Sequence, residues 1–242
     1  MKKPIGESCL KDIPKILVVV PTIEGISNKT NSSLKHQTTP YSSILIANKK
    51  IDKKFSTGER ASKALNYELG KYTNEELSVY DYLLRIDDDS YLPEHFIEEN
   101  LKLDADIVGS SGYGQLIKMK LFIEVLNARF PEVWSEDGHV WYTFKYYGLK
   151  AEKYRVKPEN FGTRNFNKKR YFGDGISRYK KGYIIPHILV SFREPMSGRK
   201  VGFNVIYIIA GYFWAMLKGE KKYFFSEMTT DLQWKRIMRR NT

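Results

Sequence analysis

The sequence lacks the features that define several common protein classes. It contains a single cysteine, Cys9, so no disulfide can form within the chain, and a reducing or redox-indifferent setting fits it. The basic N-terminal segment, residues 1–15, has no apolar stretch of the kind that a secretory signal requires. The chain also has no internal repeat, low-complexity linker or fibre-like glycine period, which excludes fibrous proteins.

What the chain does contain suits a folded domain. Of its 242 residues 42% are hydrophobic, which is too many for a disordered polymer. Its 17 tyrosines, 13 phenylalanines and 4 tryptophans need an interior in which to pack. The length accommodates one large α/β domain, or one domain with an appendage, and supplies enough residues for a core.

Charge is distributed unevenly along the chain. Residues 1–144 contain 18 Lys and Arg against 21 Asp and Glu, whereas residues 145–242 contain 22 against 7. The whole excess behind the net charge of +12 therefore lies in the C-terminal part. Such a basic segment favours an anionic partner, which includes nucleic acid, a phosphorylated ligand and lipid headgroups.

Apolar runs alternate with helical periodicities in the first half of the chain. Buried strands are predicted at residues 15–20, 43–47, 82–86 and 105–109, and helices at 26–38, 58–69 and 93–101. This alternation predicts an α/β fold with a mostly parallel open sheet flanked by helices. Ligands bind at the carboxyl ends of the strands in such sheets. Pro21, Thr22, Asn48 and Asp87–Asp89 all fall at those ends.

The second half changes in character. Helices are predicted over residues 116–130, 139–148 and 201–217, with helical spacing again in the tail, 219–242. Between them, residues 161–182 are basic, contain glycines and are interleaved with aromatic residues.

The acidic triplet Asp87-Asp88-Asp89 follows a predicted buried strand. Three adjacent carboxylates repel one another, which favours a bound cation. In extended backbone Asp87 and Asp89 share one face, so both can reach a hard divalent ion. Oxygen ligands favour Mg²⁺ or Mn²⁺ over Zn²⁺. The alternative interpretation is a solvated acidic turn that caps the helix after Pro93.

A second acidic pair, Glu136-Asp137, precedes the aromatic helix. A general base requires a carboxylate near the reacting hydroxyl, in surroundings that tune its pKa. The alternative interpretation is a helix cap that interacts favourably with the helix dipole.

The order of these motifs resembles the inverting family-two glycosyltransferases of the GT-A fold, over roughly residues 14–195. By this resemblance Asp87 and Asp89 correspond to the DxD motif, and Asp137 to the second residue of the Glu-Asp motif. The family transfers a sugar from a nucleotide-diphosphate donor with inversion at the anomeric carbon. The resemblance implies a GT-A domain over residues 1–195, Mg²⁺ or Mn²⁺ as cofactor, and Asp137 as catalytic base.

The resemblance also implies which residues bind the nucleotide sugar. Pro21, Thr22 and Glu24 match the loop around the base and ribose, and Asn48 stands where the family usually has Asp, which leaves the identity of the base open. Asp87 and Asp88 lie on the donor side, with Asp87 at the ribose or the metal and Asp89 at the metal. The remaining matches are in the helix near the nucleotide, Arg60, Lys63 and Asn66, for which a solvated helix face is the alternative.

The basic stretch occupies the place of the family's C-terminal lid. It contains Arg164, Lys168, Lys169, Arg170, Arg178 and Lys181. Arg170 and Arg178 are the candidates for contacting the diphosphate, although the chain has no clean Gln-x-x-Arg-Trp motif. His187 is interpreted either as a metal or phosphate contact or, with more support from its apolar surroundings, as a packed residue.

Residues 201–217 bear on location. Seventeen helical residues reach about 25 Å, which is at the short limit for spanning a bilayer core. Flanking basic residues and the basic tail favour a helix lying in the membrane interface, with a buried core helix as the alternative. We therefore expect residues 196–242 to associate with the cytoplasmic face of the cell membrane, as a peripheral segment or a single short span, and the acceptor to be a lipid-linked or membrane-proximal glycan.

Two other functions compete with this interpretation. A nucleotidyltransferase would need a glycine-rich phosphate loop after the first strand, which residues 21–30 match poorly. A nucleic-acid-binding or other polyanion-binding protein would use the basic, aromatic residues 161–182. The slightly acidic first part and its two acidic motifs disfavour that partner, so we expect no nucleic acid.

Overall fold

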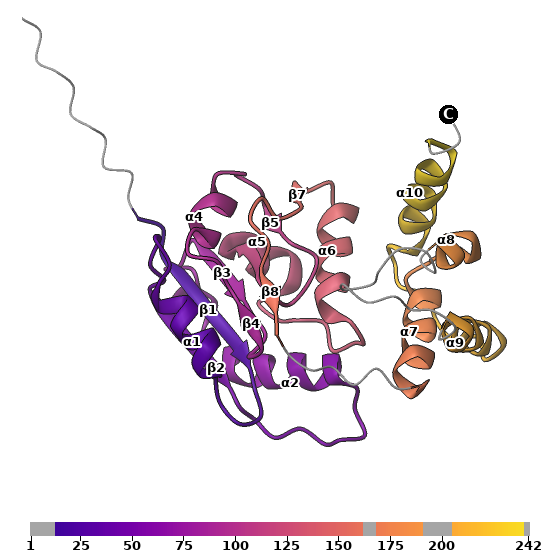
Figure 1. Cartoon of the computed structure of the whole chain (residues 1–242), viewed down its shortest axis with the longest axis horizontal. Coiled ribbons are helices and arrows are strands. Elements are labelled where there is room, and N and C mark those ends of the chain that lie inside the picture. The colour runs from indigo at the N-terminus through magenta and orange to yellow at the C-terminus, as the bar shows by residue number, and fades with distance from the viewer. Residues whose placement is uncertain (1–12, 162–167, 191–204, 240–242) are drawn as a thin grey trace, which may run out of the picture.

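Continuous apolar runs form the centre of a six-stranded sheet in the computed structural model, which describes residues 13–161, 168–190 and 205–239. In spatial order the strands are β2 (Ser43–Ala47), β1 (Ile16–Pro21), β3 (Tyr82–Arg85), β6 (Gln115–Lys118), β5 (Ile107–Val108) and β7 (Ala151–Glu152). The pairings of β1 with β2 and β3, and of β5 with β7, are parallel. Both pairings of β6 are antiparallel. The predicted α/β class with a mostly parallel sheet is confirmed (Figure 1).

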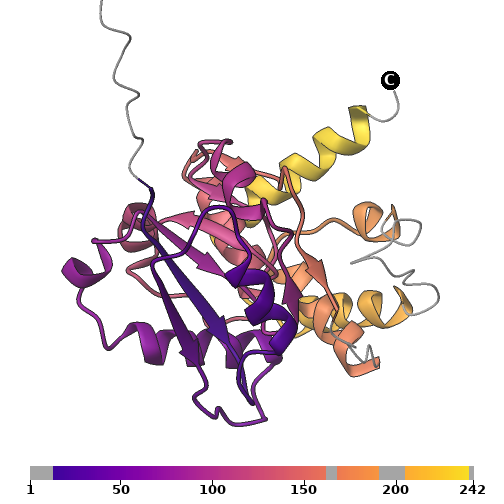
Figure 2. The ribbon, with the colours of Figure 1, turned by 60° about the vertical axis from the view of Figure 1, so that its left-hand side comes forward.

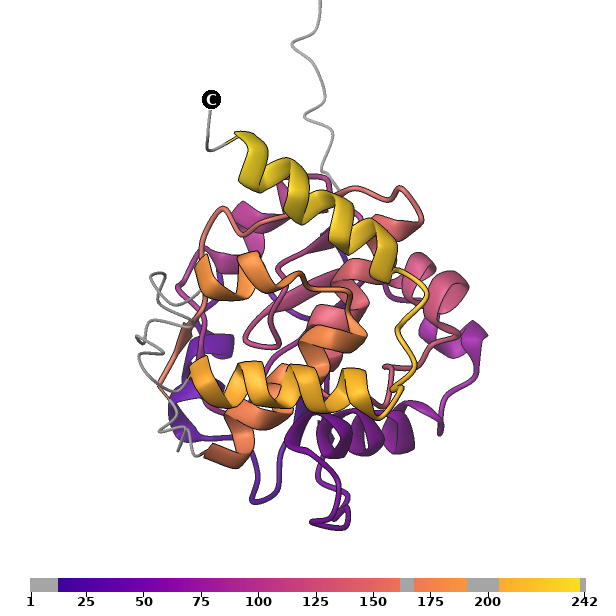
Figure 3. The same ribbon diagram turned by 90° about the vertical axis from the view of Figure 1, so that its right-hand side faces the viewer.

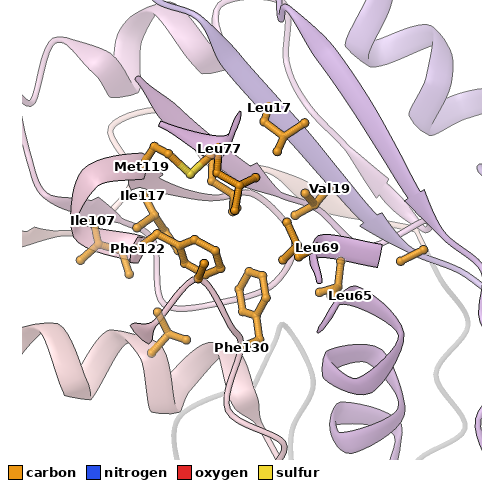
Figure 4. Close-up of a cluster of buried hydrophobic side chains, with 14 of the residues drawn as sticks. Leu17, Val19, Leu65, Leu69, Leu77, Ile107, Ile117, Met119, Phe122 and Phe130 are labelled. Carbon is orange, nitrogen blue, oxygen red and sulfur yellow. The ribbon is translucent and has the colours of Figure 1, made fainter. Parts of the chain in front are cut away.

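Helices cover both faces of this sheet. They are α1 (Asn28–Lys35), α2 (Thr57–Leu69), α3 (Asn74–Leu77), α4 (Phe96–Leu101), α5 (Met119–Leu126) and α6 (Glu136–Tyr146). Leu17 and Val19 of β1 face one core, to which α2, α3, α5 and α6 contribute (Figure 4). Val18 and Val20 face the other core, to which α1 and α4 contribute. Because both faces are covered, β1 is buried along its whole length.

Figure 2 shows the carboxyl ends of β1 and β2 lying side by side. Thr22, directly after β1, donates its backbone N–H to the carbonyl of Ala47 at the end of β2, at 3.0 Å. The loop after β1 and the loop that begins at Asn48 therefore leave the sheet at the same edge.

The helix predicted over residues 116–130 is wrong in its first part. Gln115–Lys118 form β6, hydrogen-bonded between β3 and β5, and α5 begins only at Met119. Leu116 and Ile117 are adjacent and both buried, because the two faces of the sheet are both covered. A continuous apolar run of this kind cannot be distinguished from a buried helix by periodicity.

The start of α6 also differs from the prediction. This helix begins at Glu136 rather than at residue 139. Glu136 and Asp137 therefore lie within its first turn, where the backbone N–H groups and the helix dipole favour negative charge.

A separate two-stranded sheet lies beside the acidic triplet. β4 (Ser90–Tyr91) pairs antiparallel with β8 (Glu159–Asn160). The pairing places Asn160 opposite Ser90, so residues far apart in the sequence meet next to Asp89.

The described residues of the C-terminal part form four helices: α7 (Lys168–Lys180), α8 (Ile185–Val190), α9 (Val205–Leu217) and α10 (Ser226–Arg239). They lie on the α6 side of the sheet, and Figure 3 shows α9 and α10 on one outward face. Within the described residues, no helix is both long enough and apolar enough to cross a bilayer. The predicted boundary at residues 195–196 lies outside the described residues, so the division into two domains stays a prediction.

Candidate active site

The loop after β1 lies beside the acidic triplet. Thr22 closes a turn through its Oγ1, which accepts from the Gly25 N–H at 3.0 Å and donates to the Gly25 carbonyl at 2.8 Å. The Thr22 side chain and Glu24 are also close enough to Asp88 to act on its charge. Burial raises the pKa of Asp88, and Thr22 opposes that shift. The structure therefore places Thr22 and Glu24 near Asp88, with Pro21 at the end of β1 and Asn48 exposed after β2, and their contacts with a nucleotide sugar stay predictions.

Each carboxylate of the triplet has a protein partner. Asp87 Oδ1 lies 3.0 Å from the Arg85 Nη2, Asn160 Nδ2 donates to Asp89 Oδ1 at 2.7 Å, and the Thr22 side chain lies near Asp88. These partners offset part of the repulsion within the triplet, and the bound cation stays a prediction. Within the described residues no group of three or more His, Cys, Asp or Glu is arranged to hold a metal ion.

The carboxylates still fit a hard divalent ion. Asp87 and Asp89 are half-buried and offer only oxygen atoms, which is the ligand type that Mg²⁺ and Mn²⁺ prefer. An ion held by two carboxylates keeps further coordination positions for phosphate oxygens and water.

Arg85 joins the two acidic motifs. Its side chain is buried at the end of β3, and the same Nη2 that faces Asp87 lies 2.6 Å from Glu136 Oε1. Sequence reasoning assigned Arg85 only to a strand. The signal that could have found it is a charged residue inside an otherwise apolar run that is directly followed by acids.

Asp137 is fixed by hydrogen bonds to both of its oxygens. Oδ2 accepts from the Gly112 N–H at 2.9 Å, and Oδ1 accepts from the Gly138 N–H at 2.7 Å and from the Ser135 hydroxyl at 3.1 Å. Burial raises the pKa of Asp137, but Arg85 and Lys181 together with these N–H groups outweigh burial and lower it on balance. The carboxylate is therefore ionised at neutral pH and partly exposed, as a general base must be.

The pKa of Glu136 is shifted in the opposite direction from that of Asp137. Burial raises its pKa to about 8, Arg85 opposes the shift, and the charges of Asp137 and Asp87 add to it. The Arg85 guanidinium contacts the carboxylates of Asp87 and Glu136, and it acts together with Lys181 on the charge of Asp137.

Helix α7 brings cationic side chains toward the first turn of α6. Arg178 and Lys181 are both buried, and a side chain at Gly138 would lie 3.1 Å from Lys181 Nζ. Asp174 accepts a hydrogen bond from Trp134 Nε1 at 2.9 Å, and burial raises its pKa while the Trp134 bond, Arg178 and Arg170 oppose the shift. Lys181, directly after α7, is thus held near Asp137, whereas the sequence had favoured Arg170 and Arg178 as the cationic contacts.

The other predicted basic residues and His187 have other surroundings. Lys168 Nζ lies 5.6 Å from the ring centroid of Tyr207 in α9, Lys169 is exposed, and Arg164 lies outside the described residues. The His187 ring packs edge-on against Tyr183 with centroids 5.5 Å apart, which supports the interpretation of a packed residue.

The first turns of α2 and α6 lie against each other. A side chain at Gly58 would meet Glu136 Oε2 at 2.5 Å. Further along α2, Asn66 exchanges two hydrogen bonds with the backbone of Phe130, at 2.8 and 2.9 Å, so its role is structural. Lys63 pairs with Glu132 and lies over the Phe55 ring. Arg60 is half-buried, and its nucleotide contact, like that of Lys63, stays a prediction.

Comparison with known proteins adds information on the fold. No family model and no curated protein sequence matches the chain. Among solved structures, the chain is similar to the mannosyltransferase PcManGT from Pyrobaculum calidifontis, determined in complex with GDP-Man and Mn²⁺, with 12% identity and a TM-score of 0.51. That match covers 93% of this chain and 81% of the mannosyltransferase chain. The fold is GT-A-like.

Two further solved structures match less well. TarS of S. aureus has 13% identity and a TM-score of 0.43, over 68% of this chain and 39% of the TarS chain. A cytidylyltransferase from Leptospira borgpetersenii has 11% identity and a TM-score of 0.38, over 83% of this chain and 95% of that chain. The fold assignment therefore depends on the mannosyltransferase match, and the roles of individual residues stay predictions.

Proposed function

We propose that the protein is a metal-dependent inverting glycosyltransferase of the hexosyltransferase type. The donor is a nucleotide-diphospho-sugar and the acceptor is a hydroxyl group. The observation that supports this most directly is the meeting of the two acidic motifs, since Arg85 Nη2 contacts both Asp87 after β3 and Glu136 beside Asp137. The GT-A-like fold adds support, because the similar mannosyltransferase was determined with GDP-Man and Mn²⁺.

In the proposed reaction one carboxylate acts as the base and two cationic side chains stabilise the leaving group. Asp137 removes the proton from the acceptor hydroxyl, whose oxygen forms a bond to the anomeric carbon from the face opposite the leaving group. The bond from that carbon to the diphosphate oxygen breaks, and its electron pair leaves with the nucleoside diphosphate. Arg178 and Lys181 stabilise the charge on the diphosphate. A divalent ion at Asp87 and Asp89 supplies further electrostatic stabilisation of the departing oxygen when bound.

The location that we propose is the cytoplasmic face of the cell membrane, with a lipid-linked or membrane-proximal glycan as acceptor. One side of α9, with Ile208, Gly211 and Ala215, packs inward. Its opposite side is apolar and exposed, and Ile206 and Leu217 are 60% and 83% exposed. A helix that is apolar on both sides, followed by exposed lysines, fits the interface of an anionic bilayer.

Binding of nucleic acid is the weaker alternative. That function would need the basic side chains of residues 161–182 to face an open surface. In the described part of this segment Arg178 and Lys181 are buried, and Lys181 acts on the charge of Asp137. The arrangement favours a small anionic ligand beside α6.

The test is a screen of uridine, guanosine and thymidine diphosphate sugars for Mn²⁺-dependent thermal stabilisation, since a ligand that binds only the folded state must raise its melting temperature. The ligand that binds is then used to measure transfer. Asp137→Asn should retain donor binding and lose about 100-fold or more of transfer, which is the usual effect of removing a general base. Asp52→Asn, at an exposed carboxylate, is the control. No stabilisation by any donor, or full transfer by Asp137→Asn, would contradict the proposal.

A further inference from the structure

Arg85 is a charged residue in the interior of the protein. It is 2% exposed, and its neighbours Leu83, Leu84 and Ile86 are fully buried. Strand β3, to which Arg85 belongs, pairs with β1 and β6 on its two sides. Charged side chains are rarely buried to this extent, so the position of Arg85 requires an explanation in terms of stability or of function.

The contacts of the guanidinium are poor ones for folding. Nη2 contacts both Asp87 and Glu136, whereas Nε and Nη1 are buried and have no hydrogen-bond partner among the described residues. A buried donor without a partner lowers the free energy of unfolding, because its hydration is lost and not replaced. A buried ion pair is in general no more stable than apolar residues that fill the same volume. Folding therefore gives little reason for an arginine at this position.

Gly112 connects the guanidinium to the candidate base. A Cβ at residue 112 would lie 0.9 Å from Arg85 Nη1, so only glycine leaves room for the guanidinium. The N–H of the same residue donates to Asp137 Oδ2 at 2.9 Å. The Arg85 guanidinium thus occupies the space that a side chain at residue 112 would fill, and the backbone N–H of Gly112 binds Asp137.

We propose that Arg85 is a positioning residue that fixes the carboxylates of the acceptor side relative to those of the donor side. It holds Asp87 directly and Asp137 through Glu136 and the packing of Gly112. This inference rests on the proposed glycosyltransferase function. Lysine cannot replace arginine in this role, because its ammonium group on a flexible stem lacks the rigid planar geometry that bridges two carboxylates.

Two single variants test the position of the guanidinium separately from its charge. Arg85→Lys keeps the charge and loses the planar group. Gly112→Ala keeps every ionisable group, and its methyl displaces Nη1. We expect both to fold, to bind the nucleotide sugar in the Mn²⁺ thermal-shift assay, and to show kcat reduced about 10- to 100-fold, because displacement by about 1 Å has that effect on oriented groups. Arg155→Lys, at an ion pair with Glu99 remote from the site, is the matched control.

A double-mutant cycle then shows whether Gly112→Ala acts through Arg85. In an Arg85→Met background no guanidinium remains to be displaced, so adding Gly112→Ala should change kcat less than twofold. If Arg85→Met does not fold, Arg85→Gln replaces it in the cycle. If the losses of kcat in Arg85→Met and Gly112→Ala multiply in the double variant, Gly112 acts on Asp137 alone and the proposal is overturned. A wild-type kcat in both Arg85→Lys and Gly112→Ala would also overturn the proposal.

The failure of this inference is distinguishable from the failure of the proposed function. If the wild-type chain transfers sugar and Asp137→Asn does not, while Arg85→Lys is fully active, only the role of Arg85 is wrong. If the wild-type chain neither binds nor transfers any nucleotide sugar, the proposed function itself fails, and with it the inference.

Discussion

Gly211 of α9 lies directly against the backbone of Phe172 in α7. A Cβ at residue 211 would be 2.0 Å from the Phe172 carbonyl oxygen, and a Cβ at Gly175 of α7 would be 2.0 Å from the Ile208 carbonyl oxygen. The two helices therefore cross with their backbones in contact. Because Lys181, which directly follows α7, acts on the charge of Asp137, this crossing links the outward α9 to the candidate site.

Substitution at the crossing should destabilise the fold. Gly211→Ala adds a methyl group where the Phe172 backbone leaves no space, and such overpacking costs about 1–3 kcal/mol. Denaturant unfolding measures the loss. Ala210→Gln, on the exposed side of the same helix, is the control and should change the free energy of unfolding by less than about 0.5 kcal/mol. Equal stability of Gly211→Ala and the wild type would show that α7 and α9 do not cross in this way.

The sheet was predictable from the sequence where burial alone determines the pattern. The first strand reads as a continuous apolar run because both faces of the sheet are covered by helices. The same property hid β6, because Leu116 and Ile117 gave no alternation and run directly into the apolar α5. Periodicity alone does not distinguish such a continuous apolar run from the start of a buried helix.

The candidate site was predictable in its acidic motifs and not in what holds them. Asp87, Asp89 and Asp137 followed from their order along the chain and their places next to strands and helices. Asn160 and Gly112 gave no local signal, because each acquires its role only through a tertiary contact, with Asp89 and with Asp137. For Asn66 the structure favours the backbone of Phe130 over a ligand.

Removal of the Asp89 carboxylate should abolish metal-dependent donor binding. Asp89→Asn keeps an oxygen that can accept from Asn160 Nδ2, so the fold should persist, but it removes the charge that binds a divalent ion. We expect the Mn²⁺-dependent part of the thermal shift with the nucleotide sugar to disappear.

Asn160→Ala tests the same metal site through the residue that hydrogen-bonds Asp89. This variant keeps the Asp89 carboxylate but loses the amide that orients it, and changes of this kind weaken metal binding about 10-fold. The measurement is a titration of Mn²⁺ at a fixed donor concentration. Unchanged Mn²⁺ affinity in Asp89→Asn would show that the metal does not bind at the triplet.

His139 should make the fold less stable in acid. Its ring is 9% exposed, packs against Tyr223 and Phe225, and has no hydrogen-bond partner for Nδ1 among the described residues. Burial lowers the pKa of His139 to about 4, and Lys181 adds to the shift. The unfolded chain, with an ordinary histidine pKa of about 6.5, takes up the proton first, so stability falls between pH 6.5 and 4, by up to about 3 kcal/mol.

His139→Phe should remove this pH dependence. Phenylalanine fits the aromatic surroundings and cannot be protonated, so the free energy of unfolding should fall less steeply over the same pH range. Urea unfolding at several pH values measures the slope. His36→Gln, at the exposed C-cap of α1, is the control and should leave the slope unchanged. A slope in His139→Phe as steep as in the wild type would assign the acid sensitivity to other groups.

The outward side of α9 should bind anionic membranes. We expect the full chain to sediment with vesicles of phosphatidylcholine and phosphatidylglycerol, and less so as salt screens the lysines after α9. The variant Ile206→Gln/Leu217→Gln removes the two most exposed apolar side chains of the helix without altering the side that packs on α7. Each lost aliphatic side chain contributes up to about 1.5–3 kcal/mol when fully buried, so binding should fall by at least 10-fold.

The control for membrane binding is Val79→Gln, which removes a 55% exposed apolar side chain outside α9 and should sediment like the wild type. Both variants should retain transfer to a water-soluble acceptor, because neither substitution is near Asp137. A wild-type chain that stays in the supernatant with anionic vesicles would contradict the interfacial location. The α9 variant alone should be fully active on a soluble acceptor and weakly active on a vesicle-bound one. This result would show that the apolar side of α9 is needed for access to a membrane-bound acceptor.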